Sequence, residues 1–253
     1  MNDPAGDELL SRLRRFHSDY FPRHQQRFQD LVAQGQHPKT LFIGCSDSRL
    51  VPYLLAGTGP GELFIVRNVG GFVPPYDGLQ ELPEEAGAAL APEGGAPPVA
   101  VRRLAGLHGT TAAIEFAVLQ LQVERIVVCG HSHCGAIRAA YEGVPDEAIN
   151  LREWLKLAAG ALLPVCPSPE ALRRTEQRAV VLQLERLMDY PMVKRRVEAH
   201  KLSLHGWHYV IEDGEIHVFD AAQGDFVPAS VASNPGTGPY REYVEHDGQI
   251  LCD

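Results

Sequence analysis

The amino-acid sequence predicts an α/β fold in which a central, mostly parallel β-sheet is flanked by helices, with an N-terminal helical arm and a C-terminal β-hairpin edge. Short, continuously apolar runs, as expected for strands covered on both faces, occur at TLFIG (40–44), ELFIV (62–66) and RIVVC (125–129). Amphipathic segments separate and follow these runs, which is the arrangement that parallel strands with crossover helices require. At 253 residues, the chain is long enough for one large domain with a sizeable core.

The first predicted element is an amphipathic segment over residues 7–34, interrupted near Pro22. Its apolar residues recur at helical spacing and are Leu9, Leu10, Leu13, Phe16, Phe21, Phe28, Leu31 and Val32. The segment is expected to form one or two helices, and residues 1–35 are therefore assigned to the N-terminal helical arm. The main α/β domain is assigned to residues 36–222.

The helices of the main domain follow from the same periodicity. A crossover helix is predicted over residues 107–121, between the second and third strands. Further helices are predicted near residues 136–141, 151–163 and 170–188, and Pro191 is well placed to open another.

The sheet is predicted to end in a hairpin with arms at 207–211 and 216–219, joined by the turn sequence Glu-Asp-Gly. Residues 223–253 are assigned to a C-terminal tail. Residues 74–106 are dense in Pro, Gly and Ala and poor in large apolar side chains, which predicts a mobile insertion. A surface loop without a role is favoured over a lid across a functional site.

Composition and charge exclude several classes of protein. The formal net charge is −9 and no basic run interleaved with aromatics offsets it, which argues against nucleic acid as a partner. No run approaches the roughly 18 uninterrupted apolar residues of a membrane helix. The acidic, polar start MNDPAGDELL is unlike an export signal, so a cytoplasmic protein without a membrane partner is expected. The five scattered cysteines favour thiols or metal ligands over a disulfide framework.

The stretch VVCGHSHCGA places two cysteines and two histidines at the end of the third strand. Residues three apart in a helical turn share a face, so His131 and Cys134 can converge on one ion while His133 points elsewhere. Cys129 still lies within the strand and is interpreted as a small core residue. The carboxyl ends of parallel strands meet in one crevice, where Cys45, closing LFIGC, is the only other Cys or His.

Cys45, His131 and Cys134 favour zinc, which binds thiolate and imidazole in a tetrahedron. No fourth Cys or His occupies a matching position, so the fourth corner is predicted to be open to water or substrate, as in catalytic sites. In CSDSR, Asp47 lies within reach of the same crevice, and pairing with Arg49 would hold it ionised as an acceptor for the proton of a zinc-bound water. Alternatively, Asp47 caps a helix that begins near Arg49, and Arg49 makes a surface ion pair.

The combination of CSDSR with GHSHCGA far downstream resembles the β-class carbonic anhydrases, especially their proteobacterial and carboxysomal members. GELFIVRN, AAIEFAV and KLSLHGW extend the similarity over most of residues 35–219. The resemblance implies an enzyme that reversibly hydrates CO₂ to bicarbonate and a proton by means of zinc-bound hydroxide. It also implies one Zn²⁺ per chain, held by Cys45, His131 and Cys134 within residues 36–222, with Asp47 and Arg49 as the catalytic dyad.

A substrate site is implied by the same resemblance. Gln36 is similar to a glutamine that hydrogen-bonds substrate across a dimer interface, Phe64 to an apolar wall of the CO₂ pocket, and Gly135 to a glycine whose backbone amide lies near the substrate. An exposed loop residue at Gln36 and a strand core residue at Phe64 remain alternatives. Phe42 stands where members with an inhibitory bicarbonate site have tryptophan, although Arg67 matches the arginine of that site.

Assembly into a homodimer or higher homo-oligomer is implied as well, with the arm laid on a neighbouring subunit, and a carboxysome-type assembly is a further partner the resemblance suggests. Two alternatives to CO₂ hydration stay open. The same site would suit hydrolysis of carbonyl sulfide or carbon disulfide, which are also linear, apolar and open to hydroxide attack. The chain would otherwise be an inactive zinc-binding scaffold that docks through its insertion, against which the intact Asp–Arg pair argues.

Overall fold

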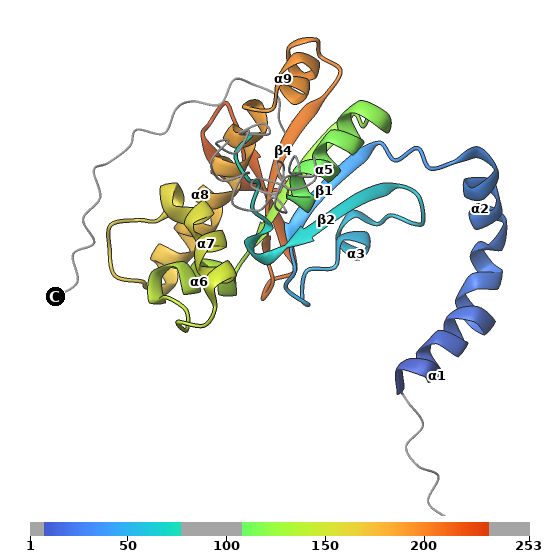
Figure 1. Ribbon diagram of the computed structural model, residues 1–253, viewed down its shortest axis with the longest axis horizontal. Helices are drawn as coiled ribbons and strands as arrows, with labels where there is room; N and C mark the ends of the chain where they lie inside the picture. Colours follow the sequence, from blue (N-terminus) through green and yellow to red (C-terminus); the bar gives the residue numbers. More distant parts are fainter. Residues whose placement is uncertain (1–7, 77–107, 233–253) are drawn as a thin grey trace, which may run out of the picture.

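The computed structural model describes residues 8–76 and 108–232, and its centre is a six-stranded sheet in the order β2-β1-β3-β4-β5-β6 (Figure 1). The strands are β1 (Thr40–Cys45), β2 (Leu63–Asn68), β3 (Arg125–His131), β4 (Ser203–Val210), β5 (Glu215–Asp220) and β6 (Asp225–Pro228). The first four are mutually parallel, whereas β5 and β6 are antiparallel additions. The predicted mostly parallel sheet and its C-terminal hairpin edge are therefore confirmed.

Helices cover both faces of this sheet. Leu41 and Ile43 of β1 point to one face, where α5 (Gly109–Glu115), α8 (Pro169–Met188) and α9 (Pro191–Glu198) build the larger core cluster. Phe42 points to the other face, which is covered by α6 (Gly135–Glu142) and α7 (Ile149–Leu155). The central strands are buried on both sides, which explains why their sequences are continuously apolar.

Several helices are extended by irregular turns. A π-helical segment, Phe16–Tyr20, joins α1 (Glu8–Arg15) to α2 (Phe21–Gln34), another, Phe116–Gln120, continues α5, and 3₁₀ turns form Val69–Gly71 and Lys156–Ala161. The short α3 (Pro52–Ala56) follows β1. No helix within the described residues combines the length and the hydrophobicity needed to cross a membrane.

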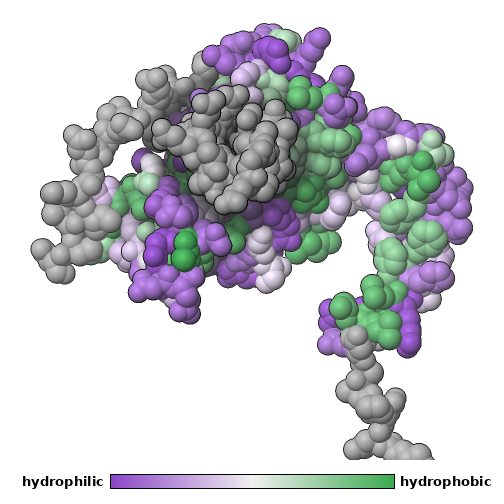
Figure 2. Space-filling view, in the orientation of Figure 1, coloured by the Kyte–Doolittle hydropathy of each residue, from purple (hydrophilic) through white to green (hydrophobic). Residues whose placement is uncertain are grey.

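The α1–α2 segment projects from the body of the chain (Figure 1). It contains no buried residue, and its contacts with the body include the side chain of Arg27, which donates to the carbonyl of Pro60 at 3.3 Å. Hydrophobic side chains are visible along this segment in the space-filling view (Figure 2). Within the segment, Leu13 and Phe16 are 58% and 47% exposed.

Two expectations about segments differ from the structure or lie outside it. Strand β6 lies within residues 223–253 and pairs with β5. The sheet therefore continues into the stretch that was assigned to a C-terminal tail. Of the insertion expected at 74–106, residues 77–106 lie outside the described residues, as do 233–253 of the tail. The choice between a surface loop and a lid therefore stays with the sequence-based prediction.

Candidate metal centre

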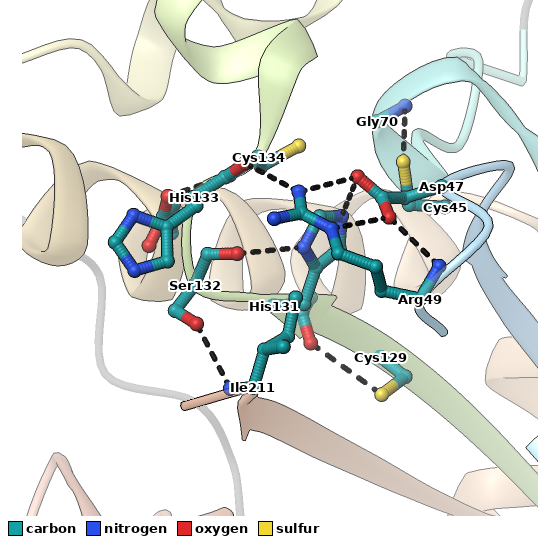
Figure 3. Close-up of polar contacts among 12 residues, drawn as sticks. Cys45, Asp47, Arg49, Gly70, Cys129, His131, Ser132, His133, Cys134 and Ile211 are labelled. Atoms are coloured by element: carbon teal, nitrogen blue, oxygen red, sulfur yellow. Dashed lines mark hydrogen bonds and ion pairs between the residues drawn. The ribbon is translucent and has the colours of Figure 1, made fainter. Parts of the chain in front are cut away.

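Cys45 closes β1 at the carboxyl end of the sheet and is 6% exposed. The 3₁₀ turn after β2 packs directly against it. Gly71 in that turn has φ +66°, and a Cβ there would lie 3.1 Å from the backbone nitrogen of Cys45, so a glycine permits the close approach. The turn supplies the N–H of Gly70, which donates to Sγ of Cys45 at 3.4 Å (Figure 3).

His131 and Cys134 come from the connection between β3 and α6. His131 is the last residue of β3, and Cys134 is the N-cap of α6. Between them His133 adopts a left-handed conformation with φ 56°, which turns its side chain out to solvent. The predicted split, with His131 and Cys134 directed to the site and His133 directed away, is what the structure shows (Figure 3).

The ligand atoms of Cys45, His131 and Cys134 all lie within 4.8 Å of one another, and all three residues are buried. Nδ1 of His131 is paired with the carbonyl of Ser132 at 2.9 Å. Its Nε2 is buried and has no hydrogen-bond partner among the described residues. An unsatisfied buried nitrogen is costly, and a metal ion beside two sulfurs would satisfy it, so the residues fit a metal site.

Proton sharing between the sulfurs supports the same interpretation. A hydrogen bond from the Cys134 thiol lowers the pKa of Cys45 well below its usual range. The same hydrogen bond raises the pKa of Cys134, and burial raises it further. Burial is the largest single influence on His131 and lowers its pKa, but the hydrogen bonds to Cys45 and to the Ser132 carbonyl, together with the charges of Cys45 and Asp47, raise the imidazole pKa overall. Thiolates are the metal-binding form of cysteine, so a divalent cation would displace the shared proton.

Asp47 and Arg49 form a bidentate ion pair next to this cluster (Figure 3). Nε of Arg49 donates to Oδ1 at 2.9 Å, and its Nη2 donates to Oδ2 at 2.8 Å and to the carbonyl of His133 at 3.0 Å. Oδ2 lies 3.9 Å from Nε2 of His131. The Arg49 hydrogen bonds hold the pKa of Asp47 well below its usual range, so the carboxylate is ionised at neutral pH.

The capping alternative for this pair does not describe what is seen. The nearest helix, α3, begins at Pro52, and its N-cap, Val51, has no side-chain cap. Asp47 instead accepts the backbone N–H of Arg49 at 3.0 Å, within the loop after β1. Arg67 fastens this loop, because its guanidinium donates to the carbonyls of Cys45 and Asp47 at 3.0 and 2.6 Å.

The three predicted substrate-binding residues lie in different places. Gly135 directly follows Cys134, and a Cβ there would meet no atom within 4 Å, so its surroundings are open. Phe64 lies on β2, four residues before the Asn68 that pairs with Cys45, or roughly 13 Å along the strand. Gln36 is exposed between α2 and β1. Within one chain, Gly135 therefore adjoins the cluster, whereas Gln36 and Phe64 do not reach it.

The side chains that support the ligand turn were not predicted, and they are those of Glu176, His208, Ser132 and Glu212. Glu176 of α8 is 4% exposed and accepts the backbone N–H of Cys134 at 2.9 Å, and its other oxygen lies 3.4 Å from Nε2 of His208. Ser132 donates to Glu212 at 2.6 Å and accepts the N–H of Ile211 at 2.9 Å, which ties the turn after β3 to the end of β4. For Glu176, the sequence signal that could have found it is a glutamate within an otherwise largely apolar stripe of the helix predicted at 170–188.

The other described cysteines differ from one another. Cys129 is 1% exposed, and burial raises the pKa of its thiol, as expected of a core residue. Cys166 is disulfide-bonded, so it is not the thiol that the sequence analysis expected.

Known proteins are similar to the stretch of this chain that carries the cluster. A family model described as carbonic anhydrase matches residues 40–216. A carbonic anhydrase of Pseudomonas aeruginosa is 37% identical over 90% of this chain and 93% of its own length, and one of Synechocystis sp. is 33% identical over 96% of this chain and 81% of its own.

Solved structures of β-carbonic anhydrases are also similar to this chain over most of its length. The β-carbonic anhydrase CcaA is 31% identical, with a TM-score of 0.72 over 87% of this chain and 90% of its own. A β-carbonic anhydrase of Sordaria macrospora, described as tetrameric, is 28% identical, with a TM-score of 0.65 over 83% of this chain and 94% of its own.

Proposed function

This chain belongs to the β-class carbonic anhydrase family, and we propose that it reversibly hydrates CO₂ to bicarbonate and a proton at a zinc ion held by Cys45, His131 and Cys134. The observation that supports this best is the mutual distance of 4.8 Å or less among two sulfurs and one imidazole nitrogen at the carboxyl ends of β1 and β3. A thiolate–imidazole–thiolate set suits zinc better than magnesium or calcium, which prefer oxygen ligands.

Zinc, when bound, would lower the pKa of a water molecule so that hydroxide is available near neutral pH. Two thiolates neutralise much of the charge of the ion, which makes help from a neighbouring proton acceptor valuable. Asp47 is suited to that task because Arg49 keeps it ionised and fixes both of its oxygens.

Asp47 and Arg49 have different roles in this proposal. Oδ2 of Asp47 faces the cluster and accepts a hydrogen bond from the attacking water, which directs the oxygen of that water at the carbon of CO₂. Arg49 also donates to the carbonyl of His133, which couples the loop after β1 to the turn that carries two ligands. The pair thereby holds the hydrogen-bond acceptor at a fixed place relative to the ligands.

The substrate pocket is proposed to be completed by a second subunit. Gly135 adjoins the cluster of its own chain, whereas Gln36 and Phe64 lie away from it, so they would act on a neighbouring site. Phe64 and Phe116, with ring centroids 5.7 Å apart, form an apolar surface beside the edge strand β2, suitable for a nonpolar gas. Homo-oligomerisation is further supported by the tetrameric relative and by the exposed apolar side chains of the arm.

Stopped-flow measurement of CO₂ hydration, together with metal analysis, tests this function. We expect one zinc per chain and turnover that rises from neutral to alkaline pH. Carbonyl sulfide and carbon disulfide assayed side by side show whether CO₂ is the preferred substrate. A zinc-loaded protein inactive toward CO₂ at every pH from neutral to alkaline would falsify the proposal.

A further inference from the structure

We infer that Glu176 is a positioning residue of the metal centre: its buried carboxyl group fixes the backbone of Cys134 and thereby aims the Cys134 sulfur at the ion. The inference rests on the proposed zinc site and extends it from the ligands to the group behind them. Glu176 contacts Cys134 through the backbone N–H and lies outside the three-residue ligand group, so its effect is on geometry and not on the reaction itself.

Two contacts hold the carboxyl group in a single orientation. One oxygen accepts the N–H of Cys134 at 2.9 Å, and the other lies 3.4 Å from Nε2 of His208. Glu176 is 4% exposed and His208 is fully buried, so solvent does not compete for either oxygen. A glutamate held in this way serves as a fixed anchor point on α8.

Glycines on two strands bring the anchor within reach of the turn. A Cβ on Gly130 of β3 would lie 2.6 Å from Cγ2 of Val180, and one on Gly206 of β4 would lie 3.0 Å from Cγ1 of the same residue. Val180 is one helical turn after Glu176. The close packing of α8 on β3 and β4 therefore places Glu176 directly behind Cys134.

Cys134 needs such an anchor because of where it lies in the chain. It is the N-cap of α6 and follows His133, whose φ of 56° is unusual for a residue with a side chain. The N–H of an N-cap has no partner within its own helix. Without Glu176 this N–H would be buried and unsatisfied, and rotation of the peptide would carry Sγ out of the position shared with Cys45 and His131.

Four variants test the inference. Glu176→Met removes the acceptor at similar length, Glu176→Asp keeps the carboxyl group but shortens its reach by one methylene, and Glu176→Gln keeps an acceptor oxygen. The control is Gln183→Met on the same helix. Gln183 is 1% exposed and also accepts a backbone N–H, that of Val73 at 2.8 Å, but it does not contact the ligand turn.

The readouts are zinc affinity by chelator competition and the visible spectrum of the cobalt-substituted protein, each measured beside thermal stability. Loss of a group that orients a metal ligand typically weakens affinity roughly 10–100-fold. We expect that loss, with an altered thiolate-to-cobalt band, in Glu176→Met and Glu176→Asp. Glu176→Gln should stay close to wild type, and Gln183→Met should lose stability without losing zinc.

The outcomes separate this inference from the proposed function. Wild-type affinity in Glu176→Asp overturns the inference even if Glu176→Met fails to fold, and so does an equal loss of zinc in Gln183→Met. A wild-type protein that binds no zinc overturns the proposed function together with this inference. Tight zinc in the wild type and in the folded Glu176 variants overturns the inference alone.

Discussion

Of the three proposed zinc ligands, Cys45 comes from β1, whereas His131 and Cys134 come from the connection between β3 and α6. Serine at this position would replace a soft thiolate with a hydroxyl that stays protonated near neutral pH. We expect Cys45→Ser to lose zinc while retaining its fold, as measured by metal analysis and circular dichroism. Cys129→Ala is the matched control, because Cys129 is buried in the adjacent strand but is not part of the ligand group. Stoichiometric zinc in Cys45→Ser would show that the ligand set is wrong.

Asp47 is predicted to act in turnover and not in metal binding. Its carboxylate is held by Arg49 and lies 3.9 Å from Nε2 of His131, outside the three-residue ligand group. Asp47→Ala should therefore keep zinc and lower kcat by about 10²–10⁴-fold, the usual contribution of a positioned proton acceptor. Stopped-flow assays on metal-quantified protein measure both quantities. Normal turnover in this variant would remove the dyad from the mechanism.

Sequence patterns predicted single elements well where one physical cause dominated. β1 and β3 were recognisable because both faces are covered, which requires continuously apolar sequence. β4 starts at Ser203, four residues before the predicted arm. The prediction missed these residues because buried and half-buried residues alternate along SLHGWHYV, so the strand has no continuously apolar run. β6 is only four residues long, DFVP, and its pairing depends on the neighbouring strand β5.

Only some contacts between distant elements could be predicted from the sequence. The convergence of Cys45 with His131 and Cys134 could be predicted, since parallel strands share a carboxyl edge. The contact from Glu176 to Cys134 spans 42 residues and depends on how closely α8 approaches β3. No local pattern reports that distance, because it is set by the glycines on the facing strands.

Helix α8 is predicted to depend on the missing side chain at Gly130. Alanine there would place its Cβ 2.6 Å from Cγ2 of Val180, closer than packed atoms tolerate. We expect Gly130→Ala to lower the free energy of unfolding by about 1–3 kcal/mol, the usual range for overpacking. Chemical denaturation measures the loss.

A second substitution separates the steric cause from a backbone effect of alanine. Val180→Ala removes the opposing methyl groups, so the double variant should be less destabilised than the sum of the two single variants. Gly109→Ala is the control, because a Cβ at Gly109 would meet nothing within 4 Å. Strictly additive losses would contradict the packing argument.

At the scale of the whole molecule, one chain leaves the predicted substrate site incomplete. The ligands, Asp47 and Gly135 lie together, but Gln36 and Phe64 lie elsewhere on the same chain. Sequence resemblance indicated that a dimer joins them, and composition alone could not, since an amphipathic helix packs equally well on its own domain. The structure favours an intermolecular role for the arm, because none of its described residues is buried and it extends away from the body (Figure 1).

The arm is accordingly predicted to control both assembly and activity. Leu13 and Phe16 are 58% and 47% exposed, and burying them against a neighbour would contribute roughly 1.5–3 kcal/mol each. Leu13→Glu combined with Phe16→Glu should shift the protein to smaller species, as measured by size-exclusion chromatography with light scattering. Activity should fall with the mass while zinc content stays constant, because Gln36 and Phe64 would leave the neighbouring site and the ligands would not. Gln25→Glu adds a charge to an exposed position on the same arm and should change neither the mass nor the activity. A double variant of unchanged mass would place the subunit interface elsewhere, whereas a small species with full activity would show that one chain forms a complete site.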